Sequence, residues 1–313
     1  MSTHSFSALT LPAEQLSNLT ELGYTEMTPI QAASLPAILQ GQDVLAKAKT
    51  GSGKTAAFGI GLLNSITVAQ FYAQALVLCP TRELADQVSK ELRRLARFTQ
   101  NIKILTLCGG QSIGPQLESL VRQPHIVVGT PGRIQEHLRK GTLKLDQLKV
   151  LVLDEADRML DMGFSEDIED VVSYTPPARQ TLLFSATYPD GIERISSKFQ
   201  RQPLKVEIEG EEDVADIKQV FIEADKHQRL SLLAAVLYQH QPTSCVVFCN
   251  TKRDCQDVCD ALSAKGISAL ALNGDLDQRD RDRVLVRFSN GSCRVLVATD
   301  VAARGLDIKD LGL

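Results

Sequence analysis

The sequence predicts an α/β protein with two domains, each built on a mostly parallel sheet flanked by helices. Short apolar runs alternate with helix-like stretches from residue 40 to 207, and a second alternation begins near residue 218. Residues 209–217 between them are polar and acidic, which is typical of an exposed linker. A glycine-rich loop also follows the first apolar run. We therefore expect one domain over residues 1–208 and another over 218–313.

The first domain is expected to contain seven strands, because each apolar run has the length of a strand and a helix-like stretch separates it from the next. The amphipathic stretches Leu84–Phe98 and Ile192–Phe199 have apolar residues at helical spacing, which predicts helices that face the core. The seven predicted strands are Val44–Ala46, Ala75–Cys79, Ile102–Leu107, Ile126–Val128, Val150–Leu153, Thr181–Phe184 and Leu204–Ile208.

The second domain is expected to repeat this architecture with helices at about 227–239, 252–265 and 277–289. Four strands are few for a doubly wound sheet, so we expect this domain to be incomplete and the chain to be a fragment. The four predicted strands are Gln219–Glu223, Ser244–Cys249, Ala269–Leu272 and Arg294–Ala298.

Composition limits the class of protein. Of the 313 residues, 43% are hydrophobic and 23% are charged, which is ordinary for a soluble globular chain. No apolar run approaches the roughly 18 residues that a membrane span requires, so we expect a cytoplasmic protein without a membrane partner. The net charge of −4 provides no overall field that attracts nucleic acid, although local groups can still bind its backbone.

The seven cysteines show no disulfide-scaffold spacing, which predicts reduced thiols. A zinc site made by Cys249, Cys255 and Cys259 is disfavoured, because the spacing is C-x5-C-x3-C and no histidine lies nearby.

The octapeptide after the first apolar run predicts a phosphate-binding loop. Glycines at 51 and 53 let backbone N–H groups converge on phosphate oxygens, Lys54 supplies a positive charge, and the Thr55 hydroxyl can reach Mg²⁺. A glycine-rich turn without a ligand is the alternative, and the strand before and helix after the loop argue against it. The predicted binding residues are Ala48, Lys49, Thr50, Gly51, Ser52, Gly53, Lys54 and Thr55.

Two acidic residues follow the buried run at 150–153, which places them at the carboxyl end of a strand, where ligands bind in open α/β sheets. Asp154 is predicted to hold Mg²⁺, and Glu155 to orient and deprotonate the water that attacks the γ-phosphate. The alternative is an acidic helix N-terminus favoured by the helix dipole. The phosphate-binding loop upstream favours the catalytic interpretation.

With the quartet Asp154-Glu155-Ala156-Asp157, the chain resembles the DEAD-box RNA helicases from about residue 6 to its end. The resemblance implies two RecA-like P-loop domains, the second incomplete, with ATP and Mg²⁺ as cofactors. It also implies a Q motif upstream of the phosphate loop, in which a glutamine pairs with the adenine edge. The residues that resemble the Q motif are Phe6, Tyr24, Thr28 and Gln31.

Further motifs resemble the family's RNA-backbone motifs. Hydroxyl groups, exposed glycine backbone and arginine suit contacts to phosphate and sugar without reading bases. Ser185 and Thr187, in Ser-Ala-Thr, are implied to couple hydrolysis to strand separation by hydrogen bonding the acidic quartet when the domains close. The implied RNA-binding residues of the first domain are Pro80, Thr81, Arg82, Gly109, Gly110, Thr130, Pro131, Gly132 and Arg133.

The second domain carries the family's later motifs. Gly305 and Asp307 are implied to approach the nucleotide sugar, and Asn273 stands where relatives often have histidine. The chain ends before the family's arginine-rich motif, whose counterparts contribute roughly 10³- to 10⁵-fold to phosphoryl transfer, so we expect impaired hydrolysis by this chain. The implied RNA-binding residues are Asn250, Thr251, Gly274, Thr299 and Asp300.

We therefore expect a monomeric, RNA-stimulated ATP hydrolase that locally unwinds RNA duplexes with little sequence preference. The context of the motifs resembles bacterial members that act on 23S ribosomal RNA during large-subunit assembly. One alternative is a nucleotide-gated RNA clamp without efficient hydrolysis. Less favoured alternatives are a DNA helicase and a metabolite kinase that shares only the phosphate loop.

Overall fold

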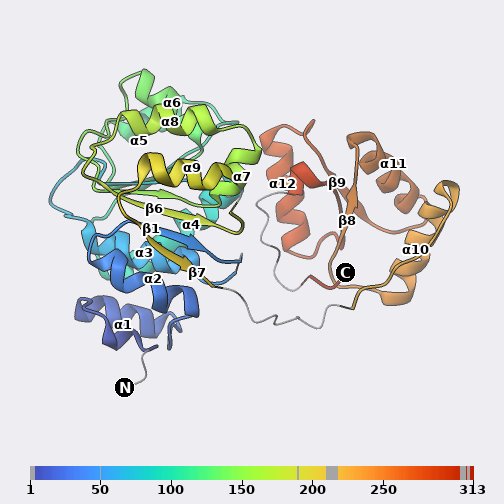
Figure 1. Ribbon diagram of the computed structural model, residues 1–313. Helices are drawn as coiled ribbons and strands as arrows, with labels where there is room; N and C mark the ends of the chain where they lie inside the picture. The colour runs from blue at the N-terminus through green and yellow to red at the C-terminus, as the bar shows by residue number, and fades with distance from the viewer. Residues whose placement is uncertain (1–3, 50, 189, 209–217, 304–307, 309–310) are drawn as a thin grey trace. The chain divides into compact units, whose positions relative to one another are not determined.

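The computed structural model describes residues 4–49, 51–188, 190–208, 218–303, 308 and 311–313. The chain divides into two compact units, Met1–Asp213 and Val214–Leu313 (Figure 1). The division falls within the expected linker 209–217, which lies outside the described residues.

A seven-stranded sheet forms the centre of the first unit. Its strand order is β3-β4-β2-β5-β6-β1-β7, and every neighbouring pair is parallel. All seven predicted strands are confirmed, with small shifts at their ends. The strands are β1 Val44–Lys47, β2 Ala75–Leu78, β3 Ile104–Leu107, β4 Ile126–Gly129, β5 Val150–Leu153, β6 Gln180–Ser185 and β7 Leu204–Glu207.

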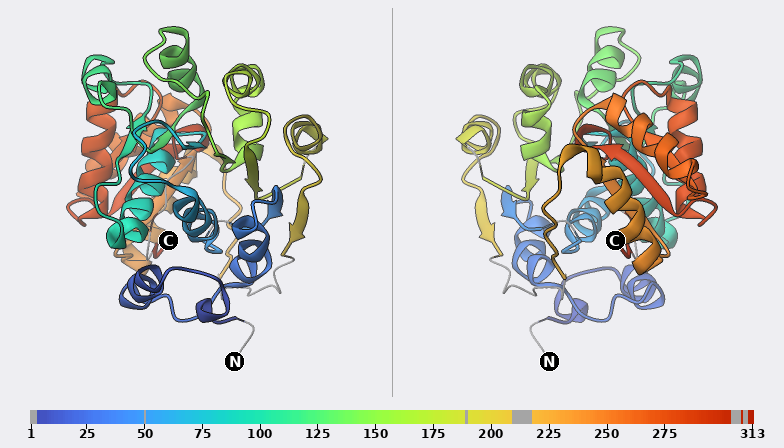
Figure 2. Two further views of the ribbon diagram at one scale, coloured as in Figure 1. Left: turned by 90° about the vertical axis from the view of Figure 1, so that its left-hand side faces the viewer. Right: turned by 90° about the vertical axis from the view of Figure 1, so that its right-hand side faces the viewer.

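Helices cover both faces of this sheet (Figures 1 and 2). The 3-10 turns Phe6–Ala8 and Ala96–Phe98 flank the first face. The helices on that face are α1 Ala13–Glu21, α2 Pro29–Leu39, α3 Lys54–Ser65 and α4 Arg82–Leu95. The helices on the other face are α5 Gly114–Leu120, α6 Pro131–Arg139, α7 Ala156–Asp161, α8 Ser165–Ser173 and α9 Asp190–Phe199.

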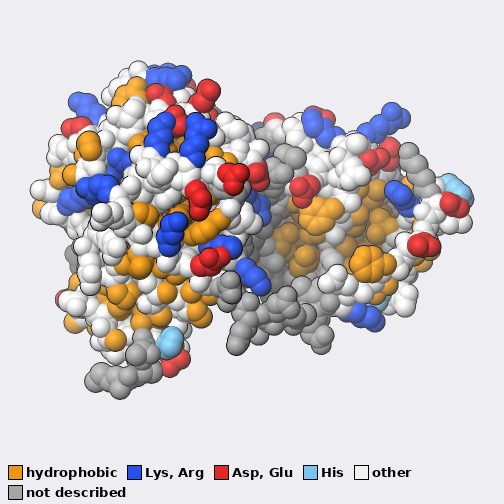
Figure 3. Space-filling model, viewed as in Figure 1, with side chains coloured by type: hydrophobic (Ala, Val, Ile, Leu, Met, Phe, Trp, Pro, Cys, Tyr) orange, Lys and Arg blue, Asp and Glu red, His pale blue; other side chains and the backbone are white. Residues whose placement is uncertain are grey.

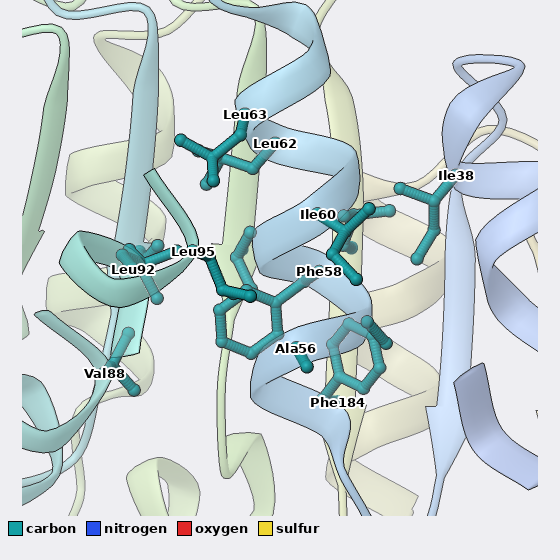
Figure 4. Packing of buried hydrophobic residues seen from close by; sticks show 14 of the residues in the cluster. Ile38, Ala56, Phe58, Ile60, Leu62, Leu63, Val88, Leu92, Leu95 and Phe184 are labelled. Carbon is teal, nitrogen blue, oxygen red and sulfur yellow. The ribbon is translucent and has the colours of Figure 1, made fainter. Parts of the chain in front are cut away.

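Two hydrophobic cores follow from the alternation of side chains along each strand. Val44 and Ala46 of β1 face the first core, whereas Leu45 faces the second. Figure 4 shows α3 in the first core, with Phe58 between α4 and β6. The rings of Phe58 and Phe184 lie 5.4 Å apart, centroid to centroid, and both are fully buried. The predicted core-facing helices at 84–98 and 192–199 are confirmed.

Buried amides and a carboxylate connect the segments at the amino-terminal edge of the sheet. Gln180 Nε2 donates to the carbonyls of Ile38 and Gln42 at 2.9 and 2.7 Å. Gln200 Nε2 donates at 2.8 Å to the carbonyl oxygen of Val44, the first residue of β1. Asp43 Oδ1 accepts from the backbone N–H near the start of β6 at 2.7 Å. These bonds satisfy buried polar groups far from the opposite, carboxyl-terminal edge.

The second unit has a three-stranded parallel sheet in the order β8-β10-β9. Helices α10 and α11 pack on one face, and α12 and α13 pack on the other. Its elements are the 3-10 turn Lys226–Gln228, α10 Arg229–His240, β8 Cys245–Cys249, α11 Lys252–Ser263, β9 Ala269–Leu272, α12 Gln278–Ser289, β10 Val295–Thr299 and α13 Asp300–Ala303. Three of its four predicted strands are confirmed.

The predicted strand Gln219–Glu223 is wrong, because the structure shows no strand there. Val220, Phe221 and Ile222 are exposed, Phe221 by 91%. The consecutive β-branched and aromatic residues 220–222 indicate β-propensity, but a strand also needs a neighbour for its backbone hydrogen bonds. No strand in the described part of the chain pairs with this segment.

The cysteine thiols of the second unit pack in or against its core. Cys255 and Cys259 lie among the buried residues of α11, and Cys249 packs against them. Burial raises the pKa of Cys259 to about 12, so the thiol stays protonated. In the residues that the structure describes, no group of three or more His, Cys, Asp or Glu could hold a metal ion.

Figure 3 shows Lys and Arg side chains intermixed with Asp and Glu on one face of the first unit. Ion pairs such as Lys198–Glu169 at 2.7 Å and Arg139–Asp170 at 3.2 Å fit this mixture. None of the described helices is long and apolar enough to cross a membrane.

Candidate functional site

Six loops of the first unit leave the carboxyl ends of parallel strands, so they lie along one edge of the sheet. The loop after β1 is the predicted phosphate loop, and the loops after β5 and β6 carry the acidic residues and Ser-Ala-Thr. The loops after β2, β3 and β4 carry the predicted RNA-backbone motifs. The fold therefore places the predicted phosphate-loop, acidic, Ser-Ala-Thr and RNA-motif residues of this unit on a shared edge.

The phosphate loop has the left-handed glycines that its chemistry requires. Gly51 has a φ of 82° and Gly53 a φ of 92°, and Gly53 caps the N-terminus of α3. At this φ a residue with a side chain would be strained, and a Cβ atom at position 53 would also displace Gln31 Nε2, which would lie 2.5 Å away, so glycine is favoured there. Lys54 is buried, and its Nζ donates to the carbonyl of Ala48 at 2.9 Å. Thr50 lies outside the described residues.

Thr28 and Gln31 hold the phosphate loop from the side of α2. Gln31 Oε1 accepts from the backbone N–H of Thr28 at 2.9 Å, which completes a capping box at the start of α2. Gln31 Nε2 donates to the Gly53 carbonyl at 3.1 Å, and Thr28 Oγ1 donates to the Ser52 carbonyl at 2.8 Å. The structure thus brings both residues to the loop, while the contact of Gln31 with adenine stays a prediction.

Phe6 and Tyr24 contact each other edge to face, with ring centroids 6.2 Å apart. Phe6 is buried in the first core, and the Tyr24 hydroxyl donates to Glu91 Oε1 at 2.5 Å. Burial, followed by the bond to Glu91, raises the pKa of Tyr24 well above its ordinary range. Both rings therefore have structural partners, and their contact with adenine stays a prediction.

Asp154 and Glu155 are buried at the end of β5. Burial raises the pKa of Asp154 to about 7, although the nearby Lys54 ammonium favours the charged form. Glu155 has a φ of 52°, a left-handed conformation that is strained for a residue with a side chain. Burial also raises the pKa of Glu155, whereas the positive charge of Arg158 lowers it. Arg158 Nε lies 3.4 Å from Glu155 Oε2.

Asp157 connects the acidic quartet to Ser-Ala-Thr within the first unit. Asp157 Oδ2 accepts from the Thr187 backbone N–H at 2.9 Å and from Thr187 Oγ1 at 2.8 Å. Ser185 Oγ donates to the Thr187 carbonyl at 2.7 Å. The predicted bond between the two motifs is therefore present inside one unit, and the residue that makes it is Asp157, which was not among the predicted site residues.

The residues present fit a nucleoside triphosphate and Mg²⁺. Ser52 Oγ is buried without a hydrogen-bond partner among the described residues, next to the left-handed glycines and the buried Lys54 ammonium. Thr55 and Asp154 would supply oxygen ligands for Mg²⁺, which usually keeps water and phosphate oxygens as its other ligands. A cluster of three protein ligands is therefore not needed here.

The loops after β2 and β4 begin helices. Pro80 is buried, and Thr81 caps α4 by accepting from the Leu84 backbone N–H at 3.3 Å. Arg82 forms an ion pair with Asp86 at 3.8 Å. Thr130 precedes α6, and Pro131 is its first residue.

The loops after β3 and β4 contact each other. The backbone N–H of Gly109 donates to Thr130 Oγ1 at 3.4 Å, and Gly110 is exposed with a φ of 76°. Gly132 is exposed as well, whereas the Arg133 side chain is only 10% exposed. Exposed glycine backbone suits phosphate contacts, so these loops fit the predicted role.

In the second unit, Asn250 and Thr251 follow β8 and are exposed. Thr251 caps α11 by accepting from the Asp254 backbone N–H at 3.1 Å. Gly274 is exposed after β9, where Asn273 Oδ1 accepts from the Asp275 backbone N–H at 3.0 Å. Asn273 therefore shapes the turn.

The loop after β10 holds the other two predicted RNA-binding residues of this unit. Thr299 is buried and accepts from the Ala302 backbone N–H at 3.3 Å, and Asp300 is exposed at the start of α13. The parallel strands β8, β9 and β10 place all five of these residues at one edge of their sheet. Gly305 and Asp307 lie outside the described residues.

Comparison with known families agrees with these motifs. Residues 28–195 match the DEAD/DEAH box helicase family, and residues 228–313 match the helicase conserved C-terminal domain. The chain belongs to the DEAD-box RNA helicase family. Its α/β fold matches solved DEAD-box structures: S. cerevisiae Dbp5 bound to RNA and ADP BeF3 has a TM-score of 0.88 at 29% identity, over 98% of this chain and 79% of that one.

Curated DEAD-box relatives cover nearly the whole chain. Escherichia coli ATP-dependent RNA helicase DbpA is 64% identical over 98% of this chain and 68% of its own length. The Geobacillus kaustophilus DEAD-box helicase CshA is 45% identical over 97% of this chain and 65% of its own length. A DEAD box protein from Methanococcus jannaschii is 37% identical with a TM-score of 0.63, covering 98% of this chain and 83% of that one.

The sequence motifs did not reveal three polar residues of this site. Asp157 had a usable signal, because it lies three residues after Asp154 within the quartet. Gln116 and His137 had none, because a single amide or imidazole on a short helix has no distinctive spacing. The structure brings both to the RNA-motif loops.

Proposed function

We propose that the protein is an RNA-stimulated ATP hydrolase that locally unwinds or remodels RNA duplexes. The observation that carries this proposal is the buried acidic pair Asp154 and Glu155 beside a phosphate loop with left-handed glycines and a buried lysine. The same sheet edge presents exposed glycine backbone in the RNA-motif loops.

In this proposal the phosphate loop binds the phosphates of ATP, and Glu155 acts as the general base. Backbone N–H groups around Gly51 and Gly53 and the Lys54 ammonium bind the phosphates. Mg²⁺, held by Thr55 and Asp154, would neutralise phosphate charge when bound. The raised pKa of Glu155 makes its carboxylate a stronger base for the attacking water.

The bond from Asp157 to Thr187 gives a physical link between the acidic quartet and Ser-Ala-Thr. A change in the acidic loop during hydrolysis would reach the segment after β6 through this bond. We propose that this is how hydrolysis is coupled to release of the RNA strand, with closure and reopening of the two units as the larger motion.

For the substrate we propose 23S ribosomal RNA or pre-ribosomal particles, bound by a cytoplasmic, monomeric protein. The support is the resemblance of the motif context to bacterial members of the family, together with the similarity to E. coli DbpA. Hydroxyl, glycine and arginine groups in the loops predict weak preference for sequence within the bound RNA.

The test is steady-state ATP hydrolysis with no nucleic acid, with a 23S ribosomal RNA fragment, and with single-stranded DNA. We expect the RNA fragment, but not single-stranded DNA, to raise ATP turnover at least about tenfold. We also expect Lys54→Ala to abolish hydrolysis. No stimulation by RNA would contradict the proposal, and equal stimulation by single-stranded DNA would favour a DNA helicase. A non-ribosomal RNA of equal length tests the substrate separately.

A further inference from the structure

Gln116 connects two RNA-motif loops through a single buried amide. Its Nε2 donates at 3.0 Å to the carbonyl of Cys108, the residue before Gly109. Its Oε1 accepts from Arg133 Nη1 at 3.0 Å and from His137 Nε2 at 3.0 Å. One side chain on α5 therefore bonds to the loop after β3 and to the first two turns of α6.

The protonation of this cluster follows from Arg133, because a guanidinium can only donate hydrogen bonds. The oxygen of the Gln116 amide must therefore face Arg133. His137 Nε2 faces the same oxygen, so it must carry a proton. In the neutral ring Nδ1 is then an acceptor, and it lies 2.9 Å from the Thr142 hydroxyl, whose single proton also faces the His137 carbonyl at 3.1 Å.

Burial favours this neutral form. His137 is fully buried, and burial, followed by the positive charge of Arg133, lowers its pKa. Glu136 favours the charged form and Lys140 opposes it, but both effects are smaller. The bonds among Gln116, Arg133 and His137 Nε2 thus have one consistent set of donors and acceptors, which fixes the orientation of the Gln116 amide.

Arg133 is held on three sides. Besides Gln116, its Nη2 donates to the Gln111 carbonyl at 2.9 Å, and its Nε forms an ion pair with Glu136 at 3.0 Å. Gln111 lies just after Gly109 and Gly110, so Arg133 and Gln116 hold that loop on both sides of the two glycines. With the Arg133 side chain only 10% exposed, its main contacts are inside the protein.

We propose that Gln116 and His137 are positioning residues for RNA binding. They hold Arg133 and the loop after β3 so that the exposed backbone at Gly110 and Gly132 keeps a fixed spacing for phosphates of one RNA strand. The direct bond from Gly109 to Thr130 Oγ1 supports the same spacing. This inference rests on the proposed function, because it concerns the RNA-binding loops of the same site.

The experiment compares the RNA concentration for half-maximal ATP hydrolysis with the Michaelis constant for ATP. In Gln116→Met, which keeps the volume but removes all three bonds, we expect the half-maximal RNA concentration to rise about tenfold. The Michaelis constant for ATP should change less than twofold. His137→Phe should show a similar but smaller rise, and His137→Gln, which restores a donor toward Gln116, should reverse most of it.

Gln200→Met is the matched control, because Gln200 is also a buried amide with two bonds to backbone carbonyls, at the amino-terminal edge of the same sheet. It tests whether loss of any buried amide weakens RNA binding. The inference would be overturned if the half-maximal RNA concentration were unchanged in Gln116→Met and His137→Phe, or if it rose equally in Gln200→Met. The proposed function would still stand in either case. Absence of RNA stimulation in the unmodified protein would instead overturn the proposed function. If Gln116→Met does not fold, the comparison of His137→Phe with His137→Gln still tests the inference.

Discussion

Two groups of loops share the carboxyl-terminal edge of the first unit's sheet, and they differ in how completely their polar groups are hydrogen-bonded. In the proposed nucleotide-binding group, Ser52 Oγ is buried without a hydrogen-bond partner among the described residues, and the buried Glu155 Oε2 has an ion pair with Arg158 but no hydrogen bond among those residues. In the RNA-motif group, Arg133, Gln116 and His137 are joined by hydrogen bonds.

The difference indicates two ways of preparing a binding site. A buried polar group without a hydrogen bond destabilises the nucleotide-free protein. A ligand that supplies the missing hydrogen bond removes this penalty, which makes binding more favourable. Groups that are already bonded instead hold backbone in place, which reduces the entropy lost on binding.

The largest effect is expected from Glu155→Gln. Loss of the proposed base should reduce ATP turnover by about 10²- to 10⁴-fold at saturating RNA, while RNA affinity stays close to that of the unmodified protein. Steady-state hydrolysis and RNA titration measure the two quantities. Glu166→Gln, an exposed acid on α8, is the control and should turn over normally. Undiminished turnover in Glu155→Gln would show that Glu155 is not the base.

Asp154→Asn should stabilise the nucleotide-free protein while weakening Mg²⁺-dependent ATP binding. Asp154 keeps its proton up to about pH 7 when folded, whereas it loses it near pH 4 when unfolded. The folded state thus binds more protons between these values, so this carboxyl makes the free energy of unfolding fall as pH rises from about 4 to 7. At pH 8 the variant should be more stable by about 1–3 kcal/mol.

Urea unfolding across this pH range tests the prediction for Asp154. The advantage of Asp154→Asn should grow as pH rises and should level off above about pH 7. Asp146→Asn changes an exposed carboxylate and should alter stability by less than about 0.5 kcal/mol at any pH. A variant at 154 that is less stable than the unmodified protein at pH 8 would contradict the interpretation of a strained, unsatisfied site.

The smallest effect is expected from Thr187→Val, which removes one of the two bonds to Asp157. The backbone N–H still donates to the carboxylate, so the free energy of unfolding should fall by only about 1 kcal/mol. Thr187→Ser keeps the hydroxyl and should restore most of it. Equal unfolding midpoints for the Val and Ser variants would mean that the hydroxyl bond adds nothing to stability.

Much of the fold could be predicted because buried parallel strands produce continuous apolar runs. Most strands of the two sheets follow this rule, whereas the edge strand β7, Leu204–Glu207, alternates apolar and charged residues. Gln219–Glu223 has the same kind of pattern but no pairing partner in the described residues, and pairing is a property of the whole sheet rather than of the segment.

The site was predictable where backbone conformation imposes a residue type, as at Gly51 and Gly53. Polar side chains that act through others were not predictable. Gln116 has a defined role only because the topology places α5 beside the start of α6 and the loop after β3. RNA binding by Arg133 stays a prediction, and the enclosure of its side chain by Gln111, Gln116 and Glu136 could not be predicted because it depends on tertiary structure.

The buried amides and the buried carboxylate at the amino-terminal edge of the first sheet have a practical consequence. Gln180, Gln200 and Asp43 join strand starts to neighbouring segments at the edge opposite the phosphate and RNA loops. Substitutions at that edge are expected to change the free energy of unfolding of the first unit without altering the loops that face the ligands. Because this edge lies opposite the phosphate and RNA loops, a fluorescent label is best attached beside it, where it stays away from the proposed ligands.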